Sequence, residues 1–311
     1  MSDTHGNQRR WYDILPASWV PYMELCHIST PAGVLLIYFP HLYGALYVSI
    51  TQGRPLPEVL QICSVLLGGT LFFSNAGHAW NDIIDAPIDG LIPRTKNRPI
   101  PRGAVSPRNA FIFVITQAIG AIVFLLMLPR EAAPCTIPSI VATAYYPWAK
   151  RHTHFTQFVL AFCLAWGVMV GASAMNIEQP WTNESLVCIF IACSSWAIIY
   201  DTTYSHMDVR DDVKIGVKSM AVLLRDRTKF LLWGALACMI VSLVRCGSLS
   251  GFSYLYGLIA AGGCLVSQGL MIFKVDLKKP ETCWWWFANG FWGAGWSITA
   301  GLVLEYLMRT L

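Results

Sequence analysis

Two acidic motifs lie at the ends of apolar stretches in this 311-residue chain. The first contains one amide and three carboxylates: Asn81, Asp82, Asp85 and Asp89. The second contains a phenol and three carboxylates: Tyr204, Asp201, Asp208 and Asp212. Carboxylates are costly beside hydrocarbon, and Mg²⁺ held by few protein oxygens usually carries phosphate oxygens as well. The Asn and Asp residues of both motifs are therefore predicted Mg²⁺ ligands, and the predicted catalytic residues are Asp82, Asp85, Asp208 and Asp212.

Basic residues follow both motifs closely, and they also indicate a phosphate ligand. A further basic pair lies between them, at the end of another apolar stretch. Carboxylates that hold a cation, next to Lys and Arg that pair with phosphate oxygens, are typical of a diphosphate site. This pattern predicts an enzyme that acts on a lipid diphosphate. The predicted diphosphate-binding residues are Arg94, Lys96, Arg98, Lys150, Arg151, Tyr204 and Lys214.

The spacing within each motif favours a helix. Residues 82, 85 and 89 are separated by three and four positions, which places them on one helical face. Pro87 and Gly90 should end or bend that helix. Residues 201, 204, 208 and 212 would likewise form one helical stripe, and Asp211 falls outside it.

The composition is that of a membrane protein. The chain is 55% hydrophobic and 13% charged, whereas soluble domains are about 25% charged. The 13 Trp residues are consistent with interfacial aromatic belts. The 10 Cys residues form no Cys-x-x-Cys pair and fall mostly in apolar runs, so we interpret them as small buried residues.

Nine apolar runs have about the length of a membrane-spanning helix. We therefore expect an all-α integral membrane protein with nine transmembrane helices around a central cavity. Residues 1–28 should be a short cytosolic tail without a signal or transit peptide, and residues 29–311 one transmembrane domain. The expected spans are 31–50, 59–80, 109–128, 135–149, 156–175, 185–203, 230–246, 252–273 and 288–307.

The positive charges give an orientation. With nine spans, 18 of the 22 Lys and Arg residues lie on the side of both acidic motifs, and this side should face the cytosol. The four arginines on the other side are Arg54, Arg130, Arg245 and Arg309. Asn183, in the sequon Asn183-Glu184-Ser185, also falls on that other side and is a possible glycosylation site.

At the acidic motifs the chain resembles the UbiA superfamily of intramembrane aromatic prenyltransferases. The family patterns N-D-x-x-D-x-x-x-D and R-T-x-x-R-P match residues 81–89 and 94–99, and D-x-x-Y-x-x-x-D-x-x-x-D matches 201–212. The family's Y-P-x-x-K-R is similar to residues 146–151. The resemblance implies Mg²⁺ as cofactor, with a prenyl diphosphate and an aromatic acceptor as substrates.

One departure concerns the acceptor. Members of the quinone-pathway branch usually open the first helix with Arg, where this chain has His27. Residues 31–44 look more like fungal members that build meroterpenoids. The resemblance therefore favours transfer of a prenyl group, such as farnesyl, to an aromatic polyketide acid in secondary metabolism, with His27 near the acceptor.

Alternatives remain open from the sequence. One is a 4-hydroxybenzoate polyprenyltransferase, with haem-pathway enzymes and terpene cyclases as further rivals. Another is a transporter, which more often has isolated charges at mid-membrane. We expect an endoplasmic reticulum location, the lipid bilayer as surroundings, no nucleic-acid partner and no obligatory protein partner.

Overall fold

Helices form the regular structure of the computed structural model, which describes residues 14–28 and 32–310. These residues include no β-strand, so the predicted all-α class is confirmed. Residues 1–13 of the predicted tail lie outside the described chain, as do Ser29, Thr30 and Pro31. The elements are α1 Val20–Leu25, α2 Ala32–Gln52, α3 Leu56–Asp89, α4 Pro107–Leu125, α5 Ala132–His152, α6 Thr156–Ala165, α7 Gly167–Ser173, the 3₁₀ turn η2 Pro180–Thr182, α8 Glu184–Ser205, α9 Val209–Ile215, α10 Met220–Leu224, the 3₁₀ turn η3 Arg225–Arg227, α11 Thr228–Ser250, α12 Tyr254–Tyr256, the π-helical η4 Gly257–Gly262, α13 Gly263–Lys274 and α14 Pro280–Thr310.

Each of the nine apolar runs coincides with a helix or with consecutive helices. Seven helical segments of the described chain are long and apolar enough to cross a membrane. The runs 135–149 and 288–307 coincide with α5 and α14, which are not among those seven. A multi-pass membrane protein is thus established, and the count of nine spans remains a prediction.

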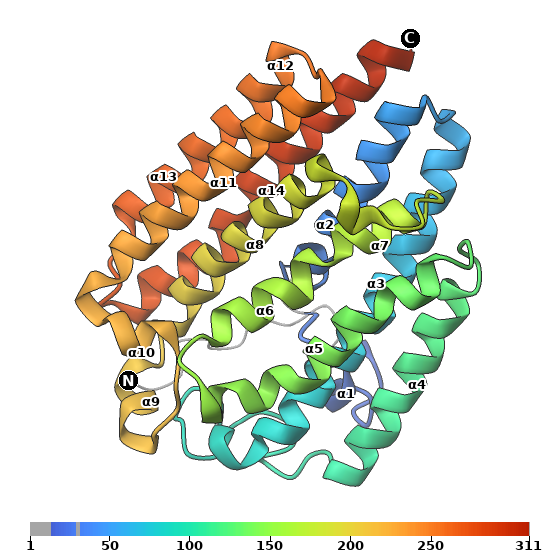
Figure 1. The fold of residues 1–311 in the computed structure, drawn as a ribbon. Helices are drawn as coiled ribbons and strands as arrows, with labels where there is room; N and C mark the ends of the chain where they lie inside the picture. Colours follow the sequence, from blue (N-terminus) through green and yellow to red (C-terminus); the bar gives the residue numbers. More distant parts are fainter. Residues whose placement is uncertain (1–13, 29–31, 311) are drawn as a thin grey trace.

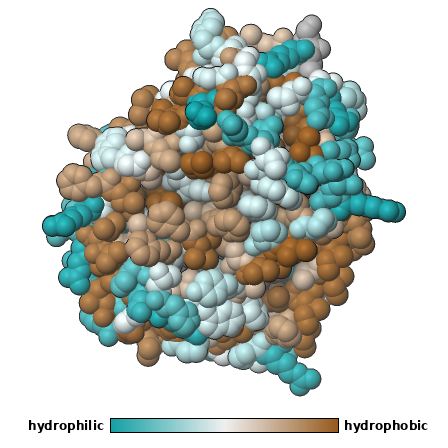
Figure 2. All heavy atoms as spheres, in the orientation of Figure 1, coloured by the Kyte–Doolittle hydropathy of each residue, from teal (hydrophilic) through white to brown (hydrophobic). Residues whose placement is uncertain are grey.

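The helices pack lengthwise in one bundle (Figure 1). A cavity lies at one end of it, lined by residues from the ends of α3, α5 and α8. The chain neighbours α3 and α4 pack together, α8 packs between α6 and α11, and α14 packs on α2 and α13. Many outward side chains are large and apolar, among them Ile119, Val241 and Phe273. Figure 2 shows such apolar side chains over much of one face. Lipid surroundings account for this exposure, because lipid tails solvate side chains that water would not.

The predicted span 156–175 is built from two helices, and the second of them, α7, approaches α2 closely. α6 ends at Ala165 and α7 begins at Gly167, where a side chain would overlap the His41 ring of α2. A side chain at Gly171 would overlap the His41 carbonyl oxygen, and one at Gly44 would overlap the Val168 carbonyl oxygen. Small residues at helix contacts allow such approach in membranes. One wall of the bundle is therefore closely packed.

The two ends of the bundle differ in charge. α3 and α8 both end in acidic residues at the same end, which we call the acidic end and define by residues 82–89 and 201–212. The four exceptional arginines lie at the opposite end, where Arg309 donates to the Gly251 carbonyl and Tyr306 donates to the Arg54 carbonyl. Asn183 is there too and accepts from the Leu186 N–H at the start of α8.

Candidate active site

The first motif occupies the last turns of α3, as its spacing predicted. α3 continues through Pro87 to Asp89, and Gly90 caps it. Asp82, Asp85 and Asp89 are all buried. The negative end of the helix dipole lies here, so three carboxylates at this point require compensating positive charge.

The second motif is not one helical stripe, and that prediction was wrong. α8 ends at Ser205, the chain turns, and Asp208 is the N-cap of the separate helix α9. Asp201 therefore lies on α8, and Asp212 lies on α9. After α9, the Lys218 N–H donates to the Lys150 carbonyl at 2.8 Å, which joins this segment to the end of α5. All four residues of the motif still line the same cavity.

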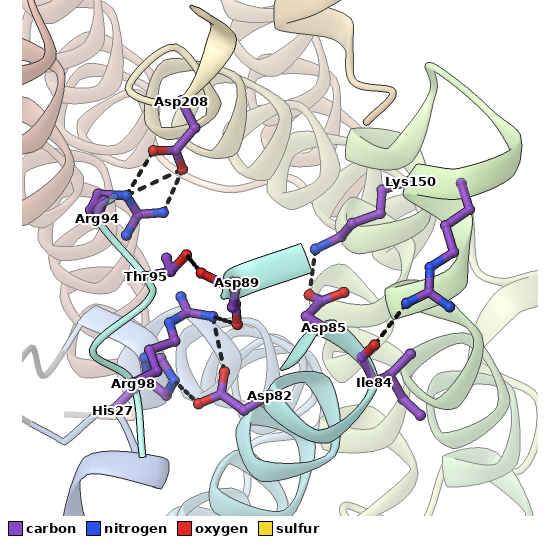
Figure 3. Close-up of polar contacts among 11 residues, drawn as sticks. His27, Asp82, Ile84, Asp85, Asp89, Arg94, Thr95, Arg98, Lys150 and Asp208 are labelled. Carbon is purple, nitrogen blue, oxygen red and sulfur yellow. Dashed lines mark hydrogen bonds and ion pairs between the residues drawn. The ribbon is translucent and has the colours of Figure 1, made fainter. Parts of the chain in front are cut away.

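Basic residues compensate the first motif directly (Figure 3). Arg98 Nη1 donates to Asp82 Oδ1 at 3.1 Å and to Asp89 Oδ2 at 2.7 Å, so one guanidinium joins two carboxylates. Lys150 Nζ, at the end of α5, donates to Asp85 Oδ2 at 2.5 Å. His27 Nε2 lies 3.0 Å from Asp82 Oδ2 and closes the other side of that carboxylate.

Arg94 makes the matching contact with the second motif. Its Nε lies 2.9 Å from Asp208 Oδ1 and its Nη2 lies 2.5 Å from Asp208 Oδ2, which is a bidentate pair. The guanidinium also lies over the Tyr204 ring, 5.2 Å from its centre. Burial acts in the opposite direction, but Tyr204 and Asp208 raise the pKa of Arg94 above its ordinary value, so it stays charged.

These residues surround a cavity of about 450 Å³ with a polar end and an apolar end. The polar end carries the acids and bases of both motifs. An aromatic wall consists of Phe287 with Tyr200, Tyr204 and Trp284, whose ring centres lie 4.4, 4.3 and 5.6 Å from that of Phe287. A second wall contains His27 stacked on His78, 5.0 Å between ring centres. Such a cavity suits a ligand with an anionic head and an apolar body.

The polar end has unsatisfied oxygens that fit a cation. Asn81 Oδ1 and Asp85 Oδ1 are buried and have no hydrogen-bond partner. Burial, together with the neighbouring Asp208 carboxylate, raises the pKa of Asp212 to about 7, despite the opposing charges of Lys150 and Arg94. A divalent cation would stabilise the charged form of this carboxylate and satisfy the oxygens left over.

No three His, Cys, Asp or Glu side chains of the described residues converge as a closed metal cage. Four of the acids are instead paired with bases, Asp82 and Asp89 with Arg98, Asp85 with Lys150 and Asp208 with Arg94, and Asp201 is held by Gln157. This arrangement fits Mg²⁺ that keeps several non-protein ligands, such as phosphate oxygens, rather than a cation enclosed by protein alone.

Several predicted site residues lie elsewhere. Asp82 does not line the cavity, since His27 and Arg98 cover its carboxylate. Lys96 is exposed on the loop, and Arg151 donates to the Ile84 carbonyl outside the cavity. Lys214 is exposed and pairs with Asp211. Loop and helix-end side chains can point either way, and here these three bases point away from the cavity.

Gln157 belongs to the site and was missed. Its Nε2 donates to Asp201 Oδ2 at 3.1 Å and to Ser205 Oγ at 3.0 Å, and its Oε1 accepts from the Met220 N–H. This buried amide thus ties α6 to α8 and to the segment after α9. The signal available in the sequence was a lone Gln at the acidic end of an apolar run.

The fold and the site together define a multi-pass membrane protein with a paired acidic and basic cavity at one end of a helical bundle. This chain belongs to the UbiA prenyltransferase family, whose model matches residues 37–295. It is therefore an enzyme that transfers prenyl groups.

Related proteins fall into two groups, fungal proteins named as prenyltransferases and proteins named as 4-hydroxybenzoate polyprenyltransferases. Prenyltransferase stbC of Stachybotrys bisbyi is 33% identical over 94% of this chain and 90% of its own length. The mitochondrial 4-hydroxybenzoate polyprenyltransferase of Saccharomyces cerevisiae is 32% identical over 95% of this chain and 78% of its own length.

Solved structures share the fold. A UbiA homologue from Aeropyrum pernix has a TM-score of 0.69 at 22% identity, and the match covers 87% of this chain and 97% of that one. A UbiA homologue from Archaeoglobus fulgidus, solved with GPP and Mg²⁺, has a TM-score of 0.69 at 15% identity, covering 94% of this chain and all of that one.

Proposed function

We propose that this enzyme transfers a prenyl group, farnesyl, from its diphosphate to an aromatic polyketide acid in meroterpenoid biosynthesis, with Mg²⁺ as cofactor. The observation that carries the proposal is the set of base–carboxylate pairs around one cavity, with buried oxygens of Asn81 and Asp85 left without partners. Such a polar end accepts a diphosphate and its counter-cation together. The UbiA homologue solved with GPP and Mg²⁺ supports this combination of ligands.

The chemistry begins with ionisation. The C1–O bond of the prenyl diphosphate breaks, its electron pair leaves with diphosphate, and an allylic cation remains. Mg²⁺, held by Asp85, Asp89, Asp208 and Asp212 with Asn81 and Asp201, would neutralise charge that develops on the leaving group. Arg94, Arg98 and Lys150 would turn from their carboxylates toward the diphosphate oxygens. Once they face the diphosphate, these charged donors would act strongly because water is excluded from the cavity.

The aromatic wall would meet the cation. Phe287, with Tyr200 stacked on it and Tyr204 tilted against it, belongs to a wall of aromatic rings whose negative quadrupole attracts positive charge. Its apolar surface also keeps water from the allylic carbon. The electron-rich ring of the acceptor then attacks C1, and loss of a ring proton restores aromaticity.

The acceptor has two candidates. A polyketide-derived phenolic acid is favoured by His27, which replaces the Arg of the quinone-pathway branch and lines the cavity. The alternative is 4-hydroxybenzoate, because relatives named for that substrate are as similar as the fungal prenyltransferases: one from Pseudomonas syringae is 32% identical over 94% of this chain.

One assay tests both candidates. Purified enzyme is supplied with Mg²⁺, farnesyl or geranylgeranyl diphosphate, and a panel of phenolic acids that includes 4-hydroxybenzoate, and products are identified by mass. We expect a farnesylated polyketide acid as the main product. Turnover of 4-hydroxybenzoate alone would establish the alternative, and absence of any prenylated product would contradict the proposal.

His27→Arg is expected to shift acceptor preference toward 4-hydroxybenzoate. A planar guanidinium binds a carboxylate bidentately, whereas the imidazole of His27 offers a single contact and is held by Asp82. The measurement is the ratio of kcat/KM for the polyketide acid and 4-hydroxybenzoate. His152→Arg is the matched control, because His152 is exposed outside the cavity. An unchanged ratio in His27→Arg would place acceptor choice in other cavity walls.

We further propose that the protein lies in the endoplasmic reticulum membrane, with its acidic end toward the cytosol. The excess of Lys and Arg at that end supports this orientation. Residues 1–28 would then be a cytosolic tail ahead of one transmembrane domain, 29–311. Asn183 would face the lumen and be open to glycosylation, although its side chain also caps α8.

Cysteine labelling tests the orientation. Asn97→Cys places an exposed thiol after the acidic end of α3, and Gln179→Cys places one before η2 and α8, at the opposite end of the bundle. In sealed microsomes, an impermeant maleimide should label the first variant and not the second. The parent chain gives the background, since nine of its Cys residues are buried and only Cys238 is exposed among described residues. Labelling of Gln179→Cys alone would reverse the orientation.

A further inference from the structure

A second hollow lies at the acidic end, outside the active-site cavity. It is a groove of about 670 Å³ between α9, the start of α11 and the loop before α14. It shares no lining residue with the active-site cavity. α9 separates the two, with Asp208 and Asp212 toward the cavity and Val213 toward the groove. The groove carries five bases: Arg210, Lys214, Arg225, Lys229 and Lys278.

The charges in this basic groove are not balanced. Asp226 is the one acidic residue among its described lining residues, and it pairs with Lys278 at 3.4 Å. Lys214 pairs with Asp211 beside the groove. The side chains of Arg210 and Arg225 make no hydrogen bond or ion pair within the described chain. Two guanidiniums are thus free to bind an anion.

Apolar side chains place the basic groove at the edge of a membrane. Lys229 Nζ donates to the Phe273 carbonyl at 3.2 Å, which joins the start of α11 to the end of α13. Phe230, next to Lys229, is 80% exposed, and Phe273 is 75% exposed. Two outward phenylalanines beside a lysine are suited to lipid chains below and lipid phosphates above.

We propose that the basic groove binds the phosphate headgroup of an anionic phospholipid from the leaflet at the acidic end. The free guanidiniums of Arg210 and Arg225 would hold the phosphate, and the acyl chains would run along Phe230 and Phe273. The positive-inside rule accounts for the number of bases on this side of the protein. It does not account for their position in a groove that has apolar side chains at its border. The site is distinct from the substrate cavity and is not needed for the proposed prenyl transfer.

Native mass spectrometry of the purified enzyme tests this site. Detergent-solubilised protein is titrated with dioleoyl phosphatidylglycerol or dioleoyl phosphatidylcholine, and bound lipid is counted. We expect retention of phosphatidylglycerol over phosphatidylcholine by the parent enzyme. Each Lys or Arg near an anionic surface is worth roughly a fivefold change in binding. Arg210→Gln/Arg225→Gln should therefore weaken phosphatidylglycerol binding by roughly 25-fold.

The matched control is Lys96→Gln/Arg108→Gln, which removes two exposed bases from the same end but outside the groove. It should retain the lipid. Equal loss in both double variants would mean diffuse surface charge and would overturn the proposal. Asp226→Asn should strengthen retention, because it removes the groove's acid. If the first double variant fails to fold by gel filtration, Arg225→Gln alone replaces it.

A competition arm identifies the source of the phosphate. Glycerol phosphate or inorganic diphosphate at millimolar concentration should not displace phosphatidylglycerol, because neither supplies acyl chains for Phe230 and Phe273. Displacement by either would show a site for soluble phosphates and would overturn the lipid assignment. Prenyl transfer measured on the same samples keeps this outcome separate from the proposed function.

Discussion

Asp85→Asn is expected to lower kcat/KM for prenyl transfer by roughly 10²- to 10³-fold, the effect typical of losing one group that stabilises charge in the transition state. Asp85 is 1% exposed, one of its oxygens binds Lys150, and the other has no partner. Asparagine keeps the shape of the side chain but removes its charge. Initial rates on detergent-purified enzyme with saturating Mg²⁺ measure the change.

Asp211→Asn is the control for this experiment. Asp211 lies on α9 beside Asp212 but contacts only the exposed Lys214, outside the cavity. The rate of Asp211→Asn should stay close to that of the parent enzyme. Chelation with EDTA should stop turnover by Asp211→Asn and by the parent enzyme, and readdition of Mg²⁺ should restore it in Asp211→Asn. Undiminished turnover by Asp85→Asn, or by the parent enzyme in EDTA, would contradict the proposed metal role.

Arg98→Leu is expected to have the largest effect on stability. Arg98 joins Asp82 and Asp89, and its removal leaves the buried Asp89 without its cation and the buried Asp82 with His27 alone. Breaking a buried pair from one side typically costs about 3–5 kcal/mol. The thermal midpoint in detergent should fall markedly, and added Mg²⁺ should raise it more in the variant than in the parent.

Arg102→Leu provides the comparison for Arg98→Leu. Arg102 is on the same loop and pairs with Glu24, but its side chain is 36% exposed. Partly exposed pairs contribute about 1 kcal/mol or less. Its midpoint should therefore change little. Equal shifts in the two arginine variants would show that the contacts with Asp82 and Asp89 do not hold the end of α3.

The helices and the first motif were predictable because they depend on local patterns. Apolar runs gave the positions of the helices, and the spacing of Asp82, Asp85 and Asp89 agreed with their place at the end of α3. The break after Ser205 was not predictable in this way. No Pro or Gly marks residues 206–208, and the end of α8 is held from another helix, because Gln157 of α6 donates to the Ser205 hydroxyl.

The bases were harder to assign than the acids. Arg98 and Lys96 lie two residues apart on one loop, yet only Arg98 reaches the cavity. Which of them turns inward depends on the path of the loop, where the Thr95 hydroxyl donates to the Asp89 carbonyl. The spacing of residues along the chain does not determine that path. More bases were therefore predicted to bind the diphosphate than the cavity contains.

The length of α3 has a consequence for how the protein enters a membrane. Its 34 residues extend about 51 Å, well beyond the roughly 30 Å of a hydrocarbon core. The carboxylates lie in its final turns, and those of α8 lie at the corresponding end. In the orientation proposed above, they leave the ribosome after the apolar part of each helix. None of these acids has to be carried across the bilayer during synthesis, so the chain can insert as ordinary apolar helices and assemble its charged site afterwards.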